Sequence, residues 1–229
     1  EPGAWGGIHI CGRAHTNAEG GKGSSEIGGA VYGGNDDADN SGTLQYIRLE
    51  YTGFAFDEEH EANGISFYGV GNGTIVDHCQ AYKGSDDGFE FFGGSVNVSN
   101  LVAVSCSDDS FDWTEGWNGK GTNLVAYQEA ESTLGYDCDC LMECDNNGSN
   151  NAATPVAHPV LKNLILVGNG GSKQGIRLRA GTEVEIDNAK VCGKGQPLTV
   201  ETALTENALK NGTSKLTNIT LTSELSSKE

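Results

Sequence analysis

Two short patterns of hydrophobic and polar residues alternate along most of the chain. In the first, two bulky residues flank one polar or charged residue, as at positions 8–10, 65–67, 89–91, 111–113, 136–138 and 176–178. In the second, a polar residue precedes a short apolar run, as at positions 46–49, 78–81, 100–103, 123–126, 163–166, 188–191 and 218–221. Both patterns have the length and alternation of short β-strands, and no helix-length apolar pattern separates them.

A sequence repeat connects the two patterns. The segment SDDGFEF at residues 85–91 recurs 22 residues later as SDDSFDW at residues 107–113. A repeat of this length with two or three strands and no helix is typical of one coil of a solenoid, while a propeller blade needs about 40 residues. The leucine-rich consensus is also absent. We therefore predict an all-β fold, a right-handed single-stranded parallel β-helix, with Phe89 and Phe111 stacked in its core.

The interruptions of the repeat predict the organisation of the domain. We expect the β-helix over residues 1–195, with insertions at 54–62 and 139–159. The pattern changes after Gly195. Residues 196–229 are predicted to cap the stack, with a helix over 199–210 and a last strand over 216–222.

Composition narrows the possible partners. The net charge of −18 argues against binding nucleic acid or an anionic membrane, which need clustered Lys and Arg, and favours binding of cations. No apolar run is long enough for a transmembrane segment. Seven cysteines favour disulfides and an exported protein, while a zinc site at Cys138, Cys140 and Cys144, with His158 as a further ligand, stays the alternative.

Stacking of coils would gather acidic residues on one face. The central residues of the first pattern form one outward row, which contains His9, Ser66, Glu90, Asp112, Asp137 and Arg177. The preceding turns form a second row, which contains Asn63, Asp87 and Asp109, flanked by Asp86 and Asp108. Crowded carboxylates repel one another unless a cation, a shared proton or a hydrogen bond relieves them.

Three interpretations of this acidic face stay open. Calcium binding by Asp86, Asp87, Asp108, Asp109 and Asp112 is the first, because Ca²⁺ takes six to eight oxygen ligands. Capping of turns by Asp side chains is the second. A catalytic role is the third.

Candidate substrate-binding residues lie close to the acidic face. Trp117 lies in the turn segment GWNG at residues 116–119, where an exposed ring could stack on a sugar. Glu90, Asp112 and Arg179 are the polar candidates for the same role.

Several motifs resemble those of a known group of proteins. The segments WGGI at 5–8, YGGNDDADNSGTL at 32–44, DDGFEFFGG at 86–94 and DDSFD at 108–112 are similar to secreted or surface-anchored proteins of Bacteroidetes. Those proteins are commonly lipoproteins, and they are treated as right-handed β-helices with a pectin-lyase-like fold and no assigned reaction. The resemblance covers residues 5–195 and implies an extracellular or outer-surface location.

A looser resemblance is to the polygalacturonases. Asp87-Gly88, Asp108-Asp109 and GIRLR at 175–179 follow in that family's order, but its Gly-His-Gly coil is missing and Arg179 stands where the family has Lys. The resemblance implies catalytic roles for Asp87, Asp108 and Asp109. A comparison with pectate lyases implies calcium held by acids and Arg177 as the base.

We therefore expect an exported or cell-surface β-helix whose calcium-binding acidic face binds a glycan or another envelope component. A polysaccharide-degrading enzyme is the alternative, and a purely structural stalk or adhesin is a third possibility.

Overall fold

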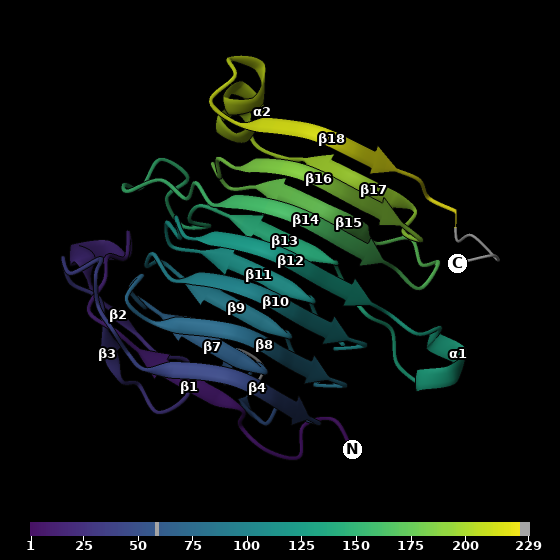
Figure 1. The fold of residues 1–229 in the computed structure, drawn as a ribbon, viewed down its shortest axis with the longest axis horizontal. Helices are drawn as coiled ribbons and strands as arrows, with labels where there is room; N and C mark the ends of the chain where they lie inside the picture. The colour runs from purple at the N-terminus through teal and green to yellow at the C-terminus, as the bar shows by residue number, and fades with distance from the viewer. Residues whose placement is uncertain (58–59, 225–229) are drawn as a thin grey trace.

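Short strands stack into two parallel sheets in the computed structural model, which describes residues 1–57 and 60–224. Within those residues each large sheet has seven strands, so the chain is an all-β parallel β-helix (Figure 1). The short-strand sheet contains β1 (Ile8–Cys11), β7 (Ile65–Tyr68), β9 (Phe89–Phe92), β11 (Phe111–Thr114), β13 (Met142–Asp145), β15 (Gln174–Arg179) and β17 (Gln196–Val200). The long-strand sheet contains β4 (Thr43–Glu50), β8 (Ile75–Tyr82), β10 (Asn97–Val104), β12 (Lys120–Tyr127), β14 (Val160–Val167), β16 (Glu185–Cys192) and β18 (Lys215–Leu221).

The predicted register of the repeat is confirmed. Phe89 pairs with Phe111 and Glu90 with Asp112 on adjacent parallel strands. The two phenylalanine rings are buried and stacked, with centroids 5.5 Å apart and an interplanar angle of 15°. Alternate residues of both sheets face a single narrow core, which explains how a chain of modest apolar content can fold.

A ladder of asparagines runs along the long-strand sheet. The Nδ2 group of Asn123 donates to Asn100 Oδ1 at 3.0 Å, and Asn163 and Asn188 each repeat this contact to the preceding coil. Each ladder residue has a positive φ, a conformation that asparagine tolerates better than most residues. The predicted ladder is therefore confirmed for these four residues, but Asn218 instead bonds Asp187 at 2.8 Å.

Smaller elements lie in the connections. They are η1 (Glu19–Gly21), β2 (Gly23–Ser24), β3 (Val31–Tyr32), β5 (Ala55–Asp57), β6 (His60–Glu61), α1 (Glu131–Leu134) and α2 (Ala203–Lys210). The long insertion at 12–42, between β1 and β4, was not predicted. Residues 58–59 of the predicted insertion at 54–62 lie outside the described residues, as do residues 225–229 of the predicted cap.

One strand prediction is wrong. Residues 136–138 are not part of the short-strand sheet, and β13 takes their place, with Met142 and Cys144 in the core. The chain after β12 first forms α1 and a loop in which Tyr136 Oη donates to Ser105 O at 2.7 Å. The outward row therefore contains Glu143 rather than Asp137, and the predicted insertion at 139–159 is interrupted by β13.

The last coil continues both sheets. β17 pairs with β15 and β18 pairs with β16, while α2 lies beyond them at the end of the stack (Figure 1). Residues 199–202 of the predicted helix therefore belong to β17 and the turn before α2. The division of the chain into a β-helix and a separate cap stays a prediction.

The expected disulfides are wrong. None of the sulfur atoms of Cys11, Cys79, Cys106, Cys138, Cys140 and Cys144 forms a disulfide. Cys79, Cys106 and Cys144 instead belong to the hydrophobic core, where a thiol packs as a small apolar group. The zinc alternative loses His158, whose ring contacts Glu183 and Glu185. In the part of the chain that the structure describes, no helix is long and apolar enough to cross a membrane.

Candidate functional site

A strongly polar pocket of about 400 Å³ opens on the outer face of the short-strand sheet. Its lining residues are Glu26, Glu61, Asp86, Asp87, Glu90, Asp108, Asp109, Asp112, Asp139, Glu143, Arg177 and Arg179. Ten of these are acids and two are arginines. All of the acids predicted to bind metal, and all of the predicted site residues except Trp117, therefore meet in one place.

Strand register builds the floor of the pocket. Ser66, Glu90, Asp112, Glu143 and Arg177 occupy equivalent positions on five adjacent strands. Their neighbours on each side face the core, so these side chains point away from it. The predicted outward direction is confirmed, but Glu90 is only 9% exposed, because surrounding segments cover this part of the face.

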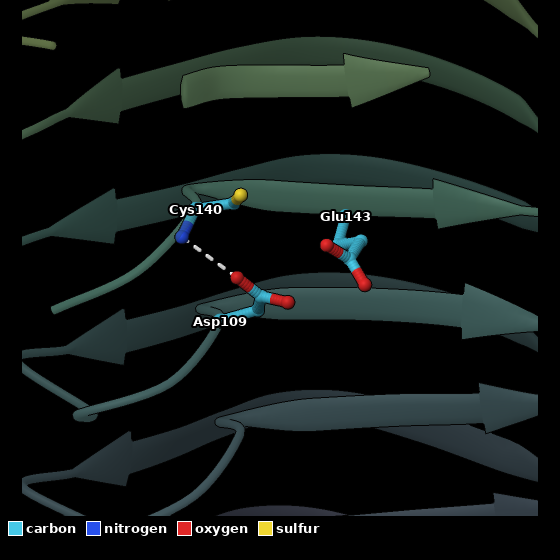
Figure 2. A group of neighbouring side chains, drawn as sticks. All are labelled: Asp109, Cys140 and Glu143. Atoms are coloured by element: carbon cyan, nitrogen blue, oxygen red, sulfur yellow. Dashed lines mark hydrogen bonds between the residues drawn. The ribbon is translucent and has the colours of Figure 1, made fainter. Parts of the chain in front are cut away.

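The turns before these strands place the second row of acids. The backbone N–H of Asp109 donates to Asp87 Oδ1 at 2.8 Å, and the N–H of Cys140 donates to Asp109 Oδ1 at 2.7 Å. Figure 2 shows the second of these bonds, with the carboxylate of Glu143 nearby on the same coil as Cys140. Each aspartate thus ties its turn to the next coil, as the capping interpretation predicts, and retains one oxygen atom for another partner.

Three groups of side chains bring possible metal ligands within 4.8 Å of one another. They are Asp86–Asp87–Asp108, Asp87–Glu90–Asp112 and Asp109–Cys140–Glu143, the last of which is drawn in Figure 2. Asp87 belongs to two groups, and both contain only carboxylates. Asp109 belongs to none of the all-carboxylate groups, and the group that contains it includes the sulfur atom of Cys140.

Burial and mutual repulsion make these carboxylates hard to ionise. Burial, with the charges of neighbouring acids second, raises the pKa of Asp87, Glu90, Asp109 and Asp112 well above the usual range. Burial and the nearby charges of Glu61 and Asp108 raise the pKa of Asp86 to about 8. Without a cation, the pocket would therefore hold protons at neutral pH.

The two arginines do not neutralise the centre of the pocket. Arg177 donates to Glu201 and Glu143, both at 3.0 Å, and Arg179 donates to Asp145 at 2.7 Å and also to Glu143. The positive charges of both arginines are therefore paired with carboxylates at the C-terminal end of the outward row. The hydrogen bond that Arg177 donates to Glu201 raises the pKa of Arg177, which stabilises its protonated form.

Two insertions bring acids that sequence analysis missed. Glu26 lies between β2 and β3, and burial raises its pKa to about 7. The insertion is anchored by Tyr32, whose ring lies 5.0 Å from that of Tyr68 and whose hydroxyl donates to Glu115 at 2.8 Å. Glu61 comes from β6. Glu61 lies in the predicted insertion at 54–62, but neither residue could be assigned to the pocket from the sequence, because their position depends on how the insertions fold back.

Other missed residues did carry a signal. Met142-Glu143-Cys144 has the same bulky–acid–bulky pattern as Phe89-Glu90-Phe91, so Glu143 could have been assigned to the row from the sequence. Asp139 and Cys140 then follow as the turn before that strand.

The prediction for Trp117 is wrong. Its ring is 1% exposed and stacks on Phe91 with centroids 4.1 Å apart, and its Nε1 donates to the carbonyl of Val96 at 3.1 Å. The turn that carries Trp117 places its indole inside the hydrophobic core, where the ring packs against Phe91. Trp117 therefore cannot contact a sugar in this structure.

The crowded acids predict how stability depends on pH. A carboxyl group with a higher pKa in the folded than in the unfolded state binds more protons when folded, so stability falls as pH rises. For Asp86, the stabilisation is full below the pKa of an ordinary Asp, about 4, and is lost as pH rises through about 8. We expect the melting temperature of the protein in chelator to fall across that window. Thermal denaturation at a series of pH values would measure this fall, and a melting temperature that rises across the window would contradict it. In Asp86→Asn the melting temperature should depend less on pH.

The stacked parallel strands define a parallel β-helix, whose short-strand sheet carries the acidic pocket on its outer face. The family described as a pectate-lyase-like β-helix domain matches residues 1–229, so the chain belongs to that family. No curated protein and no solved structure matches the chain.

Proposed function

We propose that the acidic pocket binds calcium and, through it, a glycan or another envelope component. The observation that carries the proposal is the position of Asp87, which belongs to two all-carboxylate groups at once. A bound cation would relieve the repulsion that otherwise keeps these acids protonated.

The donor atoms favour calcium over softer metals. Ca²⁺ binds several oxygen atoms with flexible geometry, and the two groups that share Asp87 supply only oxygen. The sulfur of Cys140 makes the third group less suited to calcium. Next to the outward row, Asn63 Nδ2 donates to Glu90 at 2.6 Å, while the buried Asn63 Oδ1 has no hydrogen-bond partner.

A calcium ion held at one side of the pocket leaves coordination positions for a ligand. Carboxylates and hydroxyl groups of an acidic glycan are the oxygen donors that would complete its shell. We also propose an extracellular or outer-surface location and a relationship to the secreted β-helix proteins of Bacteroidetes, supported by the motifs at 32–44 and 86–94. The cysteines no longer support export, since the six named above form no disulfide.

A polysaccharide-degrading enzyme is the second candidate. The raised pKa of Asp109 favours it, because a carboxyl group that stays protonated near neutral pH can act as a general acid. Asp87 and Asp108 would then position or activate water, but Asp87 and Asp109 each already accept a backbone hydrogen bond. A lyase with Arg177 as base is disfavoured, because Glu201 and Glu143 stabilise the protonated guanidinium.

One experiment separates the two functions. We expect calcium-dependent binding of the protein to polygalacturonate or another glycan of a panel of acidic and neutral polysaccharides, with no release of reducing sugar. Affinity electrophoresis with calcium or chelator measures binding, and a reducing-sugar assay measures hydrolysis. Activity that is lost in Asp109→Asn would overturn the binding proposal in favour of the enzyme. Binding that is unchanged by chelator would remove the role of calcium.

A further inference from the structure

An apolar patch lies on the opposite side of the coil from the acidic pocket. Adjacent strands of the long-strand sheet align Val102, Val125 and Ile165 in one outward row, and they align Val104, Tyr127 and Val167 in a parallel row. Ile165 is 51% exposed and Tyr127 is 46% exposed, so no described segment covers the patch. Contiguous exposed apolar residues on a soluble domain mark a surface of interaction.

The asparagine ladder borders this patch along its whole length. Asn100, Asn123, Asn163 and Asn188 lie one above another, two residues before the outward apolar row on β10, β12 and β14 and before Lys190 on β16. An amide has two N–H donors and an oxygen with two acceptor sites, and the ladder uses only one of each on Asn123 and Asn163. A row of unused donors and acceptors therefore repeats at the strand spacing of about 4.8 Å.

Patch and ladder meet in a groove of about 540 Å³ that runs across the coils. Its lining residues are Asn123, Val125, Asn163, Leu164, Ile165, Asn188 and Lys190. Of the described residues that line it, none carries a carboxylate, although the chain has a net charge of −18. Its chemistry is thus amide on one wall and aliphatic on the other, with a single cation at one end.

We propose that this groove binds an extended, uncharged polysaccharide lying parallel to the axis of the β-helix. A sugar ring presents an apolar face and a polar edge of hydroxyl groups, which match the aliphatic wall and the amide wall respectively. A polymer with identical units also matches a ladder with identical rungs, because the same contact can form at successive coils. With a single lysine and no carboxylate, the groove offers neither a cluster of cations nor a set of metal ligands for the acidic ligand proposed for the other face.

This inference does not rest on calcium binding or on the acidic pocket. The competing occupant is a second copy of this chain, which would cover the apolar rows by packing face to face. Apolar contact alone would suffice for such a dimer, whereas a saccharide uses both the apolar rows and the amides that repeat at successive coils. The regular amides therefore favour the saccharide.

Substitutions on one strand test the inference. Ile165→Glu places a charge in the groove at an exposed position, and Asn163→Gly removes one amide while keeping the positive φ that glycine accepts. The matched control is Val160→Glu, which changes a residue 40% exposed on the same strand outside the groove. Cello-, xylo-, manno- and chito-oligosaccharides long enough to span the ladder are titrated by calorimetry, in calcium and in chelator.

We expect the protein to bind at least one of these oligosaccharides with equal affinity in calcium and in chelator. Ile165→Glu should weaken binding at least about tenfold, which corresponds to about 1.4 kcal/mol, and Asn163→Gly should weaken it in the same direction. Val160→Glu should bind as the unaltered protein does, and melting temperatures should show all variants folded. Failure to bind any of the probes, or unchanged binding by folded Ile165→Glu, overturns the inference. A dimer in sedimentation analysis that Ile165→Glu converts to a monomer assigns the patch to self-association instead.

Discussion

Asp87→Asn is expected to abolish the stabilisation that calcium should give to the protein through the proposed site in the acidic pocket. Calcium at 100 times its dissociation constant stabilises the folded state by about 2.7 kcal/mol, which raises the melting temperature of a domain of this size by roughly 5–10 °C. Asp87 contributes to both all-carboxylate groups, so its loss leaves neither group complete. The measurement is thermal denaturation in millimolar calcium and in chelator.

Asp109→Asn is the matched comparison for this prediction. An asparagine there retains the oxygen that accepts the N–H of Cys140, and Asp109 belongs only to the sulfur-containing group. We therefore expect Asp109→Asn to keep most of the calcium effect and the double variant with Asp87→Asn to show none. Identical melting curves of the unaltered protein in calcium and in chelator would eliminate the calcium site.

Trp117→Ala is expected to destabilise the protein by about 3–5 kcal/mol, as for other buried tryptophans. The indole is enclosed between Phe91 and Trp113, so its removal leaves a cavity and an unpaired carbonyl at Val96. Thermal and chemical denaturation would measure the loss. The comparison variant is Trp5→Ala, whose side chain is 43% exposed and whose removal should cost much less.

Binding assays separate this structural role from a sugar-stacking role. Glycan binding by the folded fraction of Trp117→Ala should equal that of the unaltered protein. A variant of unchanged stability that no longer binds glycan would instead restore Trp117 to a ligand-binding surface and contradict its burial.

The repeat made the centre of the fold predictable, because stacked coils place residues 22 positions apart in register. The pairs Phe89–Phe111 and Glu90–Asp112 follow from that spacing and from the alternation of side chains alone. The same logic located six acids of the pocket, which are Asp86, Asp87, Glu90, Asp108, Asp109 and Asp112. It also predicted the ladder from Asn100 to Asn188, since one polar residue recurs at the same point of each coil.

Residues outside the repeat were not predictable in this way. Glu26 reaches the pocket only because the insertion at 12–42 folds onto Tyr68, which is a long-range contact without a local pattern. Residues 136–138 fit the strand pattern locally, but residues 142–145 form the strand, with Met142 and Cys144 buried in the core. For Trp117, turn-forming neighbours indicated exposure, while the packing of a large ring against Phe91 decided the outcome.

Pairing of every coil only with its immediate neighbours gives the molecule a modular length. A tandem duplication of residues 86–107 would add one coil and one carboxylate to the outward row, but it would also move Glu115 one coil away from Tyr32, whose hydroxyl donates to it, so the insertion at 12–42 would have to shift. Loss of a single residue within β9 would instead turn the following side chains to the opposite face, exchanging acids for core residues. Insertions and deletions during evolution can therefore change the length of the acidic row by complete coils, but not by single residues.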